Sequence, residues 1–571
     1  MEIDPDEIFL DSRNLPDFNV HQMEGRLEKP IPRRTVILIF AGFLLIASAF
    51  SVKLWLLQIH DGSVFAARSE RNRLRNTVLF SERGVIYDRN GIFLASNTTN
   101  PDSKDFSLRK YIDKAGFGHL LGYVKYPAKD SSGFYYEHNY VGKDGVEKWF
   151  NEYLSGKNGL KIVETNALGK VETESVANPP ILGKTLTLSI DARIQEEMYR
   201  AIQSAALKIG FSGGAGIVMD VKTGEIISLT SFPEYKSNAM TDGDSAAIKS
   251  YLANKNNPFL DRVVSGLYTP GSIVKPFFAM AALAENTIDP EKIIISTGSI
   301  SIPNPYDASK PTVFKDWKAL GPMNMRSAIA WSSDVYFYAV GGGYKDQIGL
   351  GILNLEKYAK IFGFGSKTGV NLDSEQSGLV PNPEWKKKMF NGDDWRVGNT
   401  YHTSIGQYGF QVTPIQAVRA VASLANYGTL VTPTVELHGN DAVVKNFPTI
   451  NFPKHNFDII HDGMRMGVTS GVATALNVPY VKYAAKTGTA ELGVSKELVN
   501  SWITGFFPYE DPKYAFAIVM EKGSRNNLVG ASAVMRDISD WMYSHTPEYF
   551  GLAPVPAVDE TATTTIGSLG L

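Results

Sequence analysis

The stretch TLTLSIDARIQEEMYRAIQSAALKIGFSGGAGIVMDVKTGEIISLTSFP, residues 185–233, decides the fold of the larger part of the chain. Its first residues alternate between polar and apolar types, which predicts a strand, and residues 192–210 have a helical spacing that ends at a glycine. Residues 215–233 form two apolar runs around a polar centre, which predicts a hairpin. We therefore expect a domain of mixed helices and strands that starts near Lys184.

The tripeptide KTG occurs three times, at Lys222, Lys367 and Lys486, in different surroundings. Lys222 stands among the polar residues between the two runs of the hairpin, so it is most simply part of the turn. Lys367 follows a helical pattern and is flanked by glycines, which predicts an exposed connection. We predict no chemistry at either of these two copies.

The third copy, in VKYAAKTGTAE, precedes two strand-like runs, SWITGFF and YAFAIVM. Small residues around Lys486 favour a sheet edge that an extended peptide approaches closely, with Gly488 leaving room for it. A lysine beside the hydroxyls of Thr487 and Thr489 is suited to anchoring a carboxylate.

A nucleophile and a base are offered by YTPGSIVKPFFAMAALAE, where a tight entry at Pro270 leads into a helical apolar run. Ser272 and Lys275 are three residues apart, so they share one helical face. A partly desolvated lysine can take the proton of a serine that is otherwise a poor nucleophile. The alternative is a capping serine and a surface lysine. Ser332 and Asp334, which interrupt AIAWSSDVYFYAVG, are suited to turning a hydroxyl and an acceptor into a cleft.

The composition limits the classes of function. With 571 residues, 43% of them hydrophobic, and a formal net charge of -2, the chain can bury a large core and form two or more domains. It has no long runs of lysine or arginine, so nothing indicates a nucleic-acid partner. A cysteine count of zero excludes disulfides, thiolate zinc sites and a cysteine nucleophile, and the nine histidines have no metal-binding spacing. We predict neither a metal nor a cofactor.

One segment near the N-terminus is long and apolar enough to cross a membrane. Residues 35–52 carry no charge, and apolar character continues to Leu57. Basic residues before the segment favour a cytoplasmic N-terminus: Arg26, Lys29, Arg33 and Arg34. We predict a cytoplasmic tail at 1–34, a single anchor at 35–57 in the cell membrane, and an extracytoplasmic remainder. A buried core helix and a signal peptide cleaved near residues 47–49 are the alternatives.

The remainder divides into three parts. Residues 58–183 are polar, contain ERGVIYDRNG and several glycine turns, and are typical of short strands and loops. We predict a spacer or interaction domain there, the larger domain at 184–549, and a loose tail rich in proline, threonine and glycine at 550–571.

Three motifs in serial order, SIVK at Ser272, SSD at Ser332 and KTG at Lys486, resemble the active-site motifs of β-lactamases and penicillin-binding proteins. ERGVIYDRNG, FGFGSKTGVNL and TSIGQYGFQVTPIQA are also similar to segments of class B penicillin-binding proteins, and no glycosyltransferase pattern precedes them. The resemblance implies an α+β fold with a single transmembrane anchor and a β-rich pedestal or dimerisation-type domain. It also implies a transpeptidase domain, similar to a serine β-lactamase, with a central antiparallel sheet flanked by helices.

Two details refine the resemblance. Many relatives have asparagine where this chain has Asp334, and aspartate followed by an aromatic cluster is similar to the elongation-type penicillin-binding protein 2. An anion there favours the charged forms of neighbouring lysines more than asparagine would. In another shared segment, Thr413, Pro414 and Gln416 predict an N-cap, a first helical residue and a capping box, which is a structural role.

The resemblance implies peptidoglycan D,D-transpeptidation. Ser272 attacks the carbonyl between the last two D-alanines of a stem peptide, Lys275 takes its proton, and D-alanine leaves to give an acyl-enzyme. Ser332 relays a proton to the leaving amine, and Asp334 orients Lys275 or Lys486. An amine from a neighbouring stem then resolves the ester.

Other implied residues bind the substrate. Lys486, Thr487 and Thr489 engage its carboxylate, with Gly488 between them, and the backbone N–H groups of Ser272 and Thr489 form an oxyanion hole.

The implied partners are stem peptides ending in D-Ala-D-Ala, β-lactam antibiotics, a multi-pass glycan polymerase of the SEDS family and other wall-synthesis proteins. Three other functions stay open. A serine β-lactamase needs a group that activates the deacylating water, and the sequence offers none that we can identify. A membrane sensor acylated by β-lactams and a catalytically silent scaffold are the others, although a scaffold would not need Ser272 or Lys275.

Overall fold

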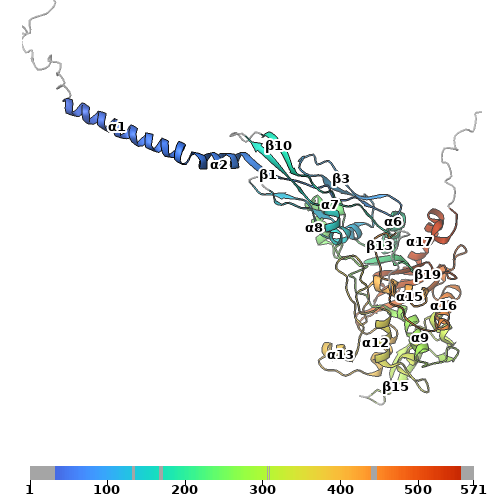
Figure 1. Cartoon of the computed structure of the whole chain (residues 1–571). Coiled ribbons are helices and arrows are strands. Elements are labelled where there is room, and N and C mark those ends of the chain that lie inside the picture. Colours follow the sequence, from blue (N-terminus) through green and yellow to red (C-terminus); the bar gives the residue numbers. More distant parts are fainter. Residues whose placement is uncertain are drawn as a thin grey trace, which may run out of the picture. The chain divides into compact units, whose positions relative to one another are not determined.

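The structure of the chain, a computed structural model, describes residues 32–131, 135–165, 171–304, 307, 309–438 and 447–553. Most of the tails predicted at 1–34 and 550–571 lies outside these ranges. The chain forms two compact units, one of residues 1–78 and 160–179 and the other of residues 79–159 and 180–571 (Figure 1). The predicted pedestal, residues 58–183, is divided between the two units, so the domain boundaries stay predictions.

The first unit contains a long apolar helix and a small sheet. Helix α1 (Arg33–Trp55) continues through one π-turn, η4 (Leu56–His60), and is followed by α2 (Gly62–Arg73). Strands β1 (Leu74–Leu79), β9 (Gly159–Thr165) and β10 (Val171–Asn178) form a three-stranded sheet in that order.

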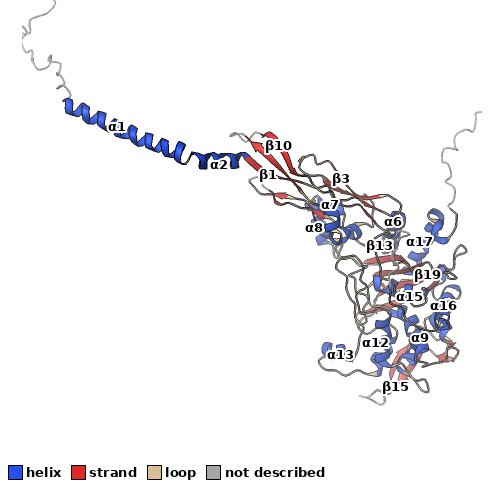
Figure 2. Ribbon diagram, in the orientation of Figure 1, coloured by secondary structure: helices blue, strands red, loops and turns tan. Residues whose placement is uncertain are grey.

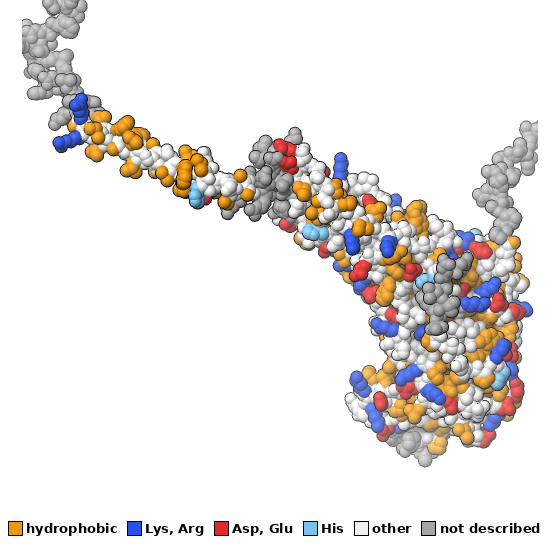
Figure 3. Space-filling model, in the orientation of Figure 1, with side chains coloured by type: hydrophobic (Ala, Val, Ile, Leu, Met, Phe, Trp, Pro, Cys, Tyr) orange, Lys and Arg blue, Asp and Glu red, His pale blue; other side chains and the backbone are white. Residues whose placement is uncertain are grey.

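The segment Arg33–His60 is the one helix of the described chain that is long and apolar enough to span a membrane. Figure 3 shows hydrophobic side chains along α1 and basic side chains at its N-terminal end. No residue of α1 is buried, which contradicts the alternative of a core helix.

The second unit begins with short strands and helices. Its four-stranded sheet has the order β11-β2-β3-β4, and two further strand pairs, β5-β8 and β6-β7, complete this β-rich region. The elements are β2 (Ile86–Tyr87), β3 (Phe93–Thr98), β4 (Leu108–Tyr111), α3 (Gly118–Leu121), β5 (Val124–Lys125), β6 (Ala128–Lys129), β7 (Tyr135–Glu137), β8 (Val141–Gly142), α4 (Gly145–Trp149), α5 (Asn151–Ser155) and β11 (Leu186–Thr187).

A buried ion cluster stabilises this region. The Arg83 guanidinium donates to Glu147 at 2.6 Å and the Arg109 guanidinium donates to the other carboxylate oxygen at 2.8 Å. All three side chains are fully buried. Asp88, which like Arg83 belongs to ERGVIYDRNG, accepts hydrogen bonds from Ile92 N and from Ala192 N, the first residue of helix α6 (Ala192–Ala205). The motif RGVIYDRNG therefore has a structural role in the fold.

A five-stranded antiparallel sheet forms the centre of the larger domain, in the order β13-β12-β20-β19-β18. Its strands are β12 (Gly213–Asp220), β13 (Ile226–Phe232), β18 (Ala484–Leu492), β19 (Leu498–Phe507) and β20 (Tyr514–Ser524). The helix predicted at 192–210 is present as α6 (Ala192–Ala205) followed by the π-turn η5 (Ala206–Gly210). The strand predicted from Thr185 is shorter than expected, since only β11 is formed there.

Helices cover both faces of this sheet (Figure 2). Alternate residues of a strand point to opposite faces, so Ile217 and Val218 of β12 belong to different hydrophobic clusters. Val218 packs with α6 and α17 (Ala531–His545), whereas Ile217 packs in the larger cluster with α9 (Lys275–Ala284) and α15 (Pro414–Ala425). The predicted α+β class, with helices flanking a central antiparallel sheet, is confirmed.

The remaining elements complete the helical side of the domain. They are α7 (Ser237–Thr241), α8 (Ser245–Ala253), η6 (Gly271–Val274), β14 (Ile294–Ser296), β15 (Ser299–Ile302), β16 (Thr312–Lys315), β17 (Gly321–Met323), α10 (Met325–Trp331), α11 (Asp334–Gly342), α12 (Gly351–Ile361), α13 (Pro383–Met389), α14 (Val397–Ser404), α16 (Lys454–Thr469), η8 (Thr474–Leu476) and η9 (Pro547–Phe550).

Candidate active site

The serine predicted as nucleophile lies in a tight turn at the start of a buried helix. Ser272 belongs to the 3-10 turn η6, and α9 begins at Lys275 with a proline in its first turn. Gly271 has a φ of 58°, which glycine adopts without strain, and its N–H donates to the Gly406 carbonyl at 2.9 Å. The turn leaves Ser272 partly exposed while Lys275 is completely buried.

The predicted Ser332 and Asp334 lie where two helices meet. Helix α10 ends at Trp331, Ser332 adopts the left-handed conformation with φ 59° and ψ 38°, and α11 starts at Asp334. The Ser333 hydroxyl caps α11 by accepting from Tyr336 N at 3.2 Å. A non-glycine residue in this region of the backbone map is uncommon, and such residues concentrate at functional sites.

The third motif lies on β18, which is the edge strand of the central sheet, as predicted. Lys486 is buried, Thr487 is half-buried and Thr489 is exposed. The role predicted for Gly488, which was to leave room for an extended peptide, is wrong, however. A Cβ atom on Gly488 would lie 2.9 Å from Ile273 Cγ2 and from the Pro270 carbonyl oxygen. The space that Gly488 leaves is therefore filled by the serine turn of this chain, which packs directly against β18.

Both predicted lysines converge on one hydroxyl. Lys486 Nζ donates to Ser332 Oγ at 2.9 Å and to the Thr487 carbonyl at 2.7 Å. Lys275 Nζ donates to the Ser332 carbonyl at 2.7 Å, lies 3.3 Å from Ser332 Oγ, and pairs with Asp334 Oδ1 at 2.6 Å. Of the two lysines that Asp334 was expected to orient, it therefore pairs with Lys275. Ser332 Oγ bridges the two amines.

The electrostatics of the two amines differ because only one has a carboxylate partner. Burial, and then the positive charge of Lys275, lower the pKa of Lys486 well below its ordinary value, while Asp334 opposes this shift. Burial raises the pKa of Asp334, and the Lys275 ammonium opposes that rise. One-fifth of the Asp334 side chain is still exposed, so solvent moderates its desolvation. Burial and the neighbouring cation therefore both disfavour the protonated form of Lys486.

The nucleophile itself is unengaged. Within the described residues, the Ser272 hydroxyl makes no hydrogen bond to Lys275 or Lys486, because Lys275 is held by Ser332 and Asp334. Ser272 and Lys275 are nevertheless within one turn, so a change in the lysine side chain alone can bring amine and hydroxyl together. The site is arranged to exchange protons among two amines and two hydroxyls.

The other residues singled out in the sequence have structural positions. Lys222 is exposed in the turn between β12 and β13, where Asp220 accepts from its backbone N–H at 2.8 Å. Lys367 is also exposed, after α12. Thr413 and Gln416 form the predicted capping box of α15. These predictions are confirmed.

One residue beside the site was not found from the sequence. Asp316, at the end of β16, reaches the Ser332–Asp334 turn through a hydrogen bond to Ser333. Its only local signal is a single acid among hydrophobic and basic residues in TVFKDWKAL, a pattern that also fits an ordinary loop.

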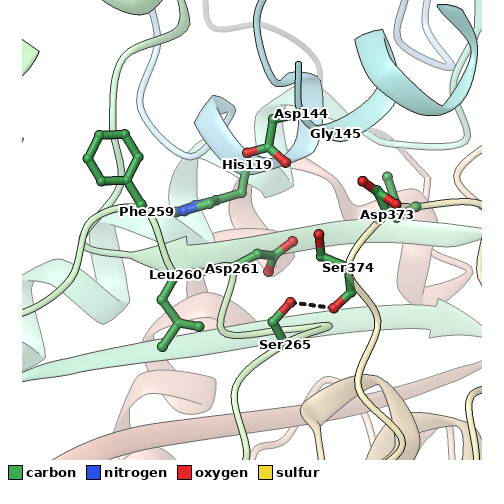
Figure 4. Close-up of a pocket in the computed structure, with 10 residues that line it drawn as sticks. His119, Asp144, Gly145, Phe259, Leu260, Asp261, Ser265, Asp373 and Ser374 are labelled. Carbon is green, nitrogen blue, oxygen red and sulfur yellow. Dashed lines mark hydrogen bonds between the residues drawn. The ribbon is translucent and has the colours of Figure 1, made fainter. Parts of the chain in front are cut away.

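A separate cavity lies elsewhere in the second unit. It has a volume of about 90 Å³ and is lined by residues that include His119, Asp144, Asp261 and Asp373 (Figure 4). Burial lowers the pKa of His119 to about 3 and raises that of Asp261 to about 6. None of the predicted site residues lines this cavity.

The geometry is typical of a class of enzyme. A serine in a tight turn, two buried lysines and a bridging serine hydroxyl beside a sheet edge are the arrangement expected of an active-serine site of the acyl-transfer type.

Comparison with known proteins gives the family. Residues 214–540 match the penicillin binding protein transpeptidase domain, and residues 102–188 match the penicillin-binding protein dimerisation domain. The chain belongs to the penicillin-binding protein transpeptidase family. It is 30% identical to the peptidoglycan D,D-transpeptidase MrdA of Acinetobacter baumannii, over 88% of this chain and 86% of that one. It is 28% identical to MrdA of Haemophilus influenzae, over 90% and 92% of the two chains.

Solved structures agree. The penicillin-binding protein PBP2 of Helicobacter pylori, in a complex with MreC, is 29% identical with a TM-score of 0.68, covering 82% of this chain and 99% of that one. A chain from a peptidoglycan synthase complex is 25% identical with a TM-score of 0.70, covering 92% of this chain and all of that one.

Proposed function

We propose that this transpeptidase cross-links the stem peptides of peptidoglycan through an acyl-enzyme on Ser272, and that β-lactams acylate the same serine. The observation that carries the proposal is the convergence of Lys275 and Lys486 on the Ser332 hydroxyl, one turn from a partly exposed and unengaged Ser272. Such a cluster has no evident structural purpose, because two buried amines repel each other.

The acylation step begins with a proton transfer. The Ser332 hydroxyl bridges the two amines, so a proton can pass from Lys275 to Lys486 through it, and the substrate carboxylate that binds at Lys486 favours the protonated form of that lysine. The neutral Lys275 then takes the proton of Ser272 as the serine oxygen bonds to the carbonyl carbon. The amide C–N bond breaks, and a proton relayed by Ser332 leaves with the amine of D-alanine.

Deacylation uses the same groups in reverse. The amine of a second stem peptide attacks the ester, loses a proton to the lysine system, and releases the Ser272 hydroxyl. A new amide bond replaces the one that was cleaved, so no oxidant, metal or nucleotide is required.

Substrate binding falls to β18 and the serine turn. Lys486, Thr487 and Thr489 engage the terminal carboxylate of the donor stem, and the N–H groups of Ser272 and Thr489 stabilise the oxyanion. The close approach of these two backbones supports the assignment, since a Cβ atom on Gly271 would lie 3.1 Å from the Thr489 carbonyl oxygen. Gly488 makes that approach possible.

The location of the enzyme follows from its N-terminal helix. The segment Arg33–His60 anchors the chain as a single span, and the transpeptidase domain lies outside the cytoplasmic membrane. Related structures include PBP2 with MreC and a peptidoglycan synthase complex, which supports a wall-synthesis assembly for this chain as well. Its membrane partner is a glycan polymerase of the SEDS family. Unchanged hydrogen exchange in residues 79–159 upon adding that polymerase would contradict contact with this region.

The test is intact-mass analysis of the purified chain during incubation with a penicillin, beside Ser272→Ala. We expect a stable adduct on the wild type and none on the variant. An adduct that forms and disappears within a turnover would indicate a β-lactamase, and no adduct on folded wild type would indicate a silent scaffold. A cross-linking assay with purified glycan strands separates a transpeptidase from a sensor, because a sensor forms the adduct without making cross-links.

A further inference from the structure

The turn from Ser332 to Asp334 requires support from outside its own segment. Ser332 occupies a left-handed conformation, with φ 59° and ψ 38°, that a residue with a side chain disfavours. The same turn places Ser332 Oγ and Asp334 Oδ1 on the Lys275 amine. Any residue that fixes this conformation therefore fixes the geometry of the proton exchange.

Asp316 supplies such support through one oxygen atom. Its Oδ2 accepts hydrogen bonds from Ser333 Oγ at 2.8 Å, from Val335 N at 3.1 Å and from Ser296 Oγ at 3.0 Å. Ser333 precedes Asp334 and Val335 follows it, so Asp316 holds the backbone on both sides of the catalytic carboxylate. The side chain is buried with 9% exposed.

Asp316 and the two residues after it also stabilise the chain on the N-terminal side of Ser332. Asp316 Oδ1 accepts from Trp317 N at 2.9 Å, and Trp317 Nε1 donates to the Trp331 carbonyl at 3.1 Å. Lys318 Nζ lies 4.4 Å from the Trp317 ring centroid and 4.7 Å from that of Trp331. Residues 316–318 thus contact the chain immediately before Ser332 as well as after it.

The charge of Asp316 has no counter-ion. Across the described part of the chain no lysine, arginine or histidine lies within ion-pair distance of it, and hydroxyl and N–H groups satisfy its oxygens instead. Burying an anion in this way is costly unless the anion organises its donors. Its position at the first turn of α11 is favourable, because the helix dipole attracts negative charge there.

We propose that Asp316 is a positioning residue of the acylation reaction, one that holds the Ser332–Asp334 turn in the conformation that aligns Lys275. This inference rests on the function proposed above. Asparagine at position 316 would keep the volume but remove the charge, and an amide nitrogen in place of Oδ2 would leave Val335 N–H without an acceptor.

The test compares acylation rates of the full chain with a penicillin, followed by intact mass. For Asp316→Asn we expect a loss of about ten- to a hundredfold, the range expected when one or two hydrogen bonds to a charged acceptor no longer hold a catalytic turn. Glu521→Gln is the matched control, since Glu521 is also a buried carboxylate but pairs with Arg262 away from the site. We expect the control to acylate at the wild-type rate.

The pH profile separates positioning from a general loss of structure. The charged or titratable groups that act on Asp334 are Lys275, Lys486, Asp316 and Tyr338. The Asp316 charge adds to the effect of burial in raising the pKa of Asp334. Removing it lets Asp334 ionise at lower pH, so the acidic limb of the acylation profile should move to lower pH in Asp316→Asn. A purely structural defect would lower the rate equally at every pH.

The outcomes separate a failure of the proposed function from a failure of the role proposed for Asp316. If the wild type forms no adduct, the proposed function fails before Asp316 is tested. If the wild type is acylated and Asp316→Asn matches it in rate and pH profile, the positioning role is wrong and the transpeptidase proposal stands. Should Asp316→Asn unfold, Ser333→Ala decides, because it removes one of the same hydrogen bonds from the turn without burying a new group. An unchanged rate in folded Ser333→Ala overturns the proposal.

Discussion

Two buried ion clusters in the second unit look alike in composition and differ in what they can do. In the β-rich region, Arg83 and Arg109 enclose Glu147, and in the transpeptidase domain Lys275, Lys486 and Asp334 surround Ser332. Guanidinium groups do not lose a proton in proteins, so the first cluster can only hold its shape. Burial opposes ionisation of Glu147, but the two arginines outweigh it and keep its pKa below the usual value.

Both clusters combine two basic side chains with one carboxylate, but in the second the basic groups are lysines and a hydroxyl lies between their amines. Desolvation and a neighbouring cation both lower the pKa of a lysine, and both act on Lys486. The backbone differs too, since the catalytic cluster contains a left-handed serine. Burial of charge alone therefore does not identify an active site in this protein. The proposed active site differs in that its buried amines can exchange a proton.

The largest effect should come from the third KTG lysine. We expect Lys486→Ala to lower the rate of penicillin acylation by about a thousandfold, within the range for loss of a group that transfers protons. The controls are Lys222→Ala and Lys367→Ala, which remove the same side chain from exposed copies of the same tripeptide. If all three variants were acylated at the same rate, Lys486 would have no more part in acylation than the two exposed lysines.

The next effect concerns stability and not chemistry. Glu147→Gln leaves two buried guanidinium groups without a counter-ion, so we expect the free energy of unfolding to fall by about 3–5 kcal/mol. Denaturant unfolding measures this, and the rate of acylation per folded molecule should stay the same. Glu196→Gln, which breaks an exposed pair with Lys114, is the control and should change stability by less than about 1 kcal/mol. Loss of acylation by folded Glu147→Gln would show that the two clusters are coupled.

A smaller effect is expected where the catalytic cluster meets the sheet. Gly488→Ala places a methyl group 2.9 Å from Ile273 Cγ2, so the serine turn must move or the strand must bend. We expect a loss of stability of about 1–3 kcal/mol together with slower acylation. Gly493→Ala, just after the end of β18, is the control, because a Cβ atom there meets nothing within 4 Å and only the φ of 66° adds strain. If Gly488→Ala kept both properties, the close packing of turn and strand would not matter for acylation.

The smallest effect is a shift of a pH profile. The Asp334 charge raises the pKa of Lys486 against the larger effect of burial, so Asp334→Asn should lower that pKa further. Because acylation requires a neutral amine, its rate should reach the plateau at a lower pH than in the wild type. Asp458→Asn, a change to a surface carboxylate paired with Lys454, is the control. An identical profile for wild type and Asp334→Asn would show that the Asp334 charge does not affect the pH dependence of acylation.

Local patterns predicted several elements of the larger domain, in and outside the site. The helix after Ser272, the hairpin turn at Lys222, the capping box at Thr413 and the edge strand at Lys486 were all expected from nearby residues. Each depends on periodicity, turn residues or caps within about a dozen positions, which is the range that such patterns report. The family motifs added the order of the three site segments.

Contacts between distant segments were not predictable in this way. Asp316 gave no recognisable signal, because its importance comes from the hydrogen-bond donors at Ser333 and Val335. The role predicted for Gly488 was wrong for the same reason, because the sequence does not show that the serine turn packs on that strand. Nor did anything in RGVIYDRNG indicate that Glu147 would pair with Arg83.

By itself, the sequence determined the N-terminal helix that is long and apolar enough to span a membrane, the α+β class, and the residue types available for acyl transfer. Hydrophobic length, local periodicity and motif spacing are properties of continuous segments, and they survive in the unfolded chain. Only the tertiary structure decided that Lys275 pairs with Asp334, that Ser332 bridges both lysines, and that the serine turn uses the space at Gly488. Proton affinities depend on burial and on charges a few ångströms away, and those distances exist only after the sheet edge and the helices have packed together.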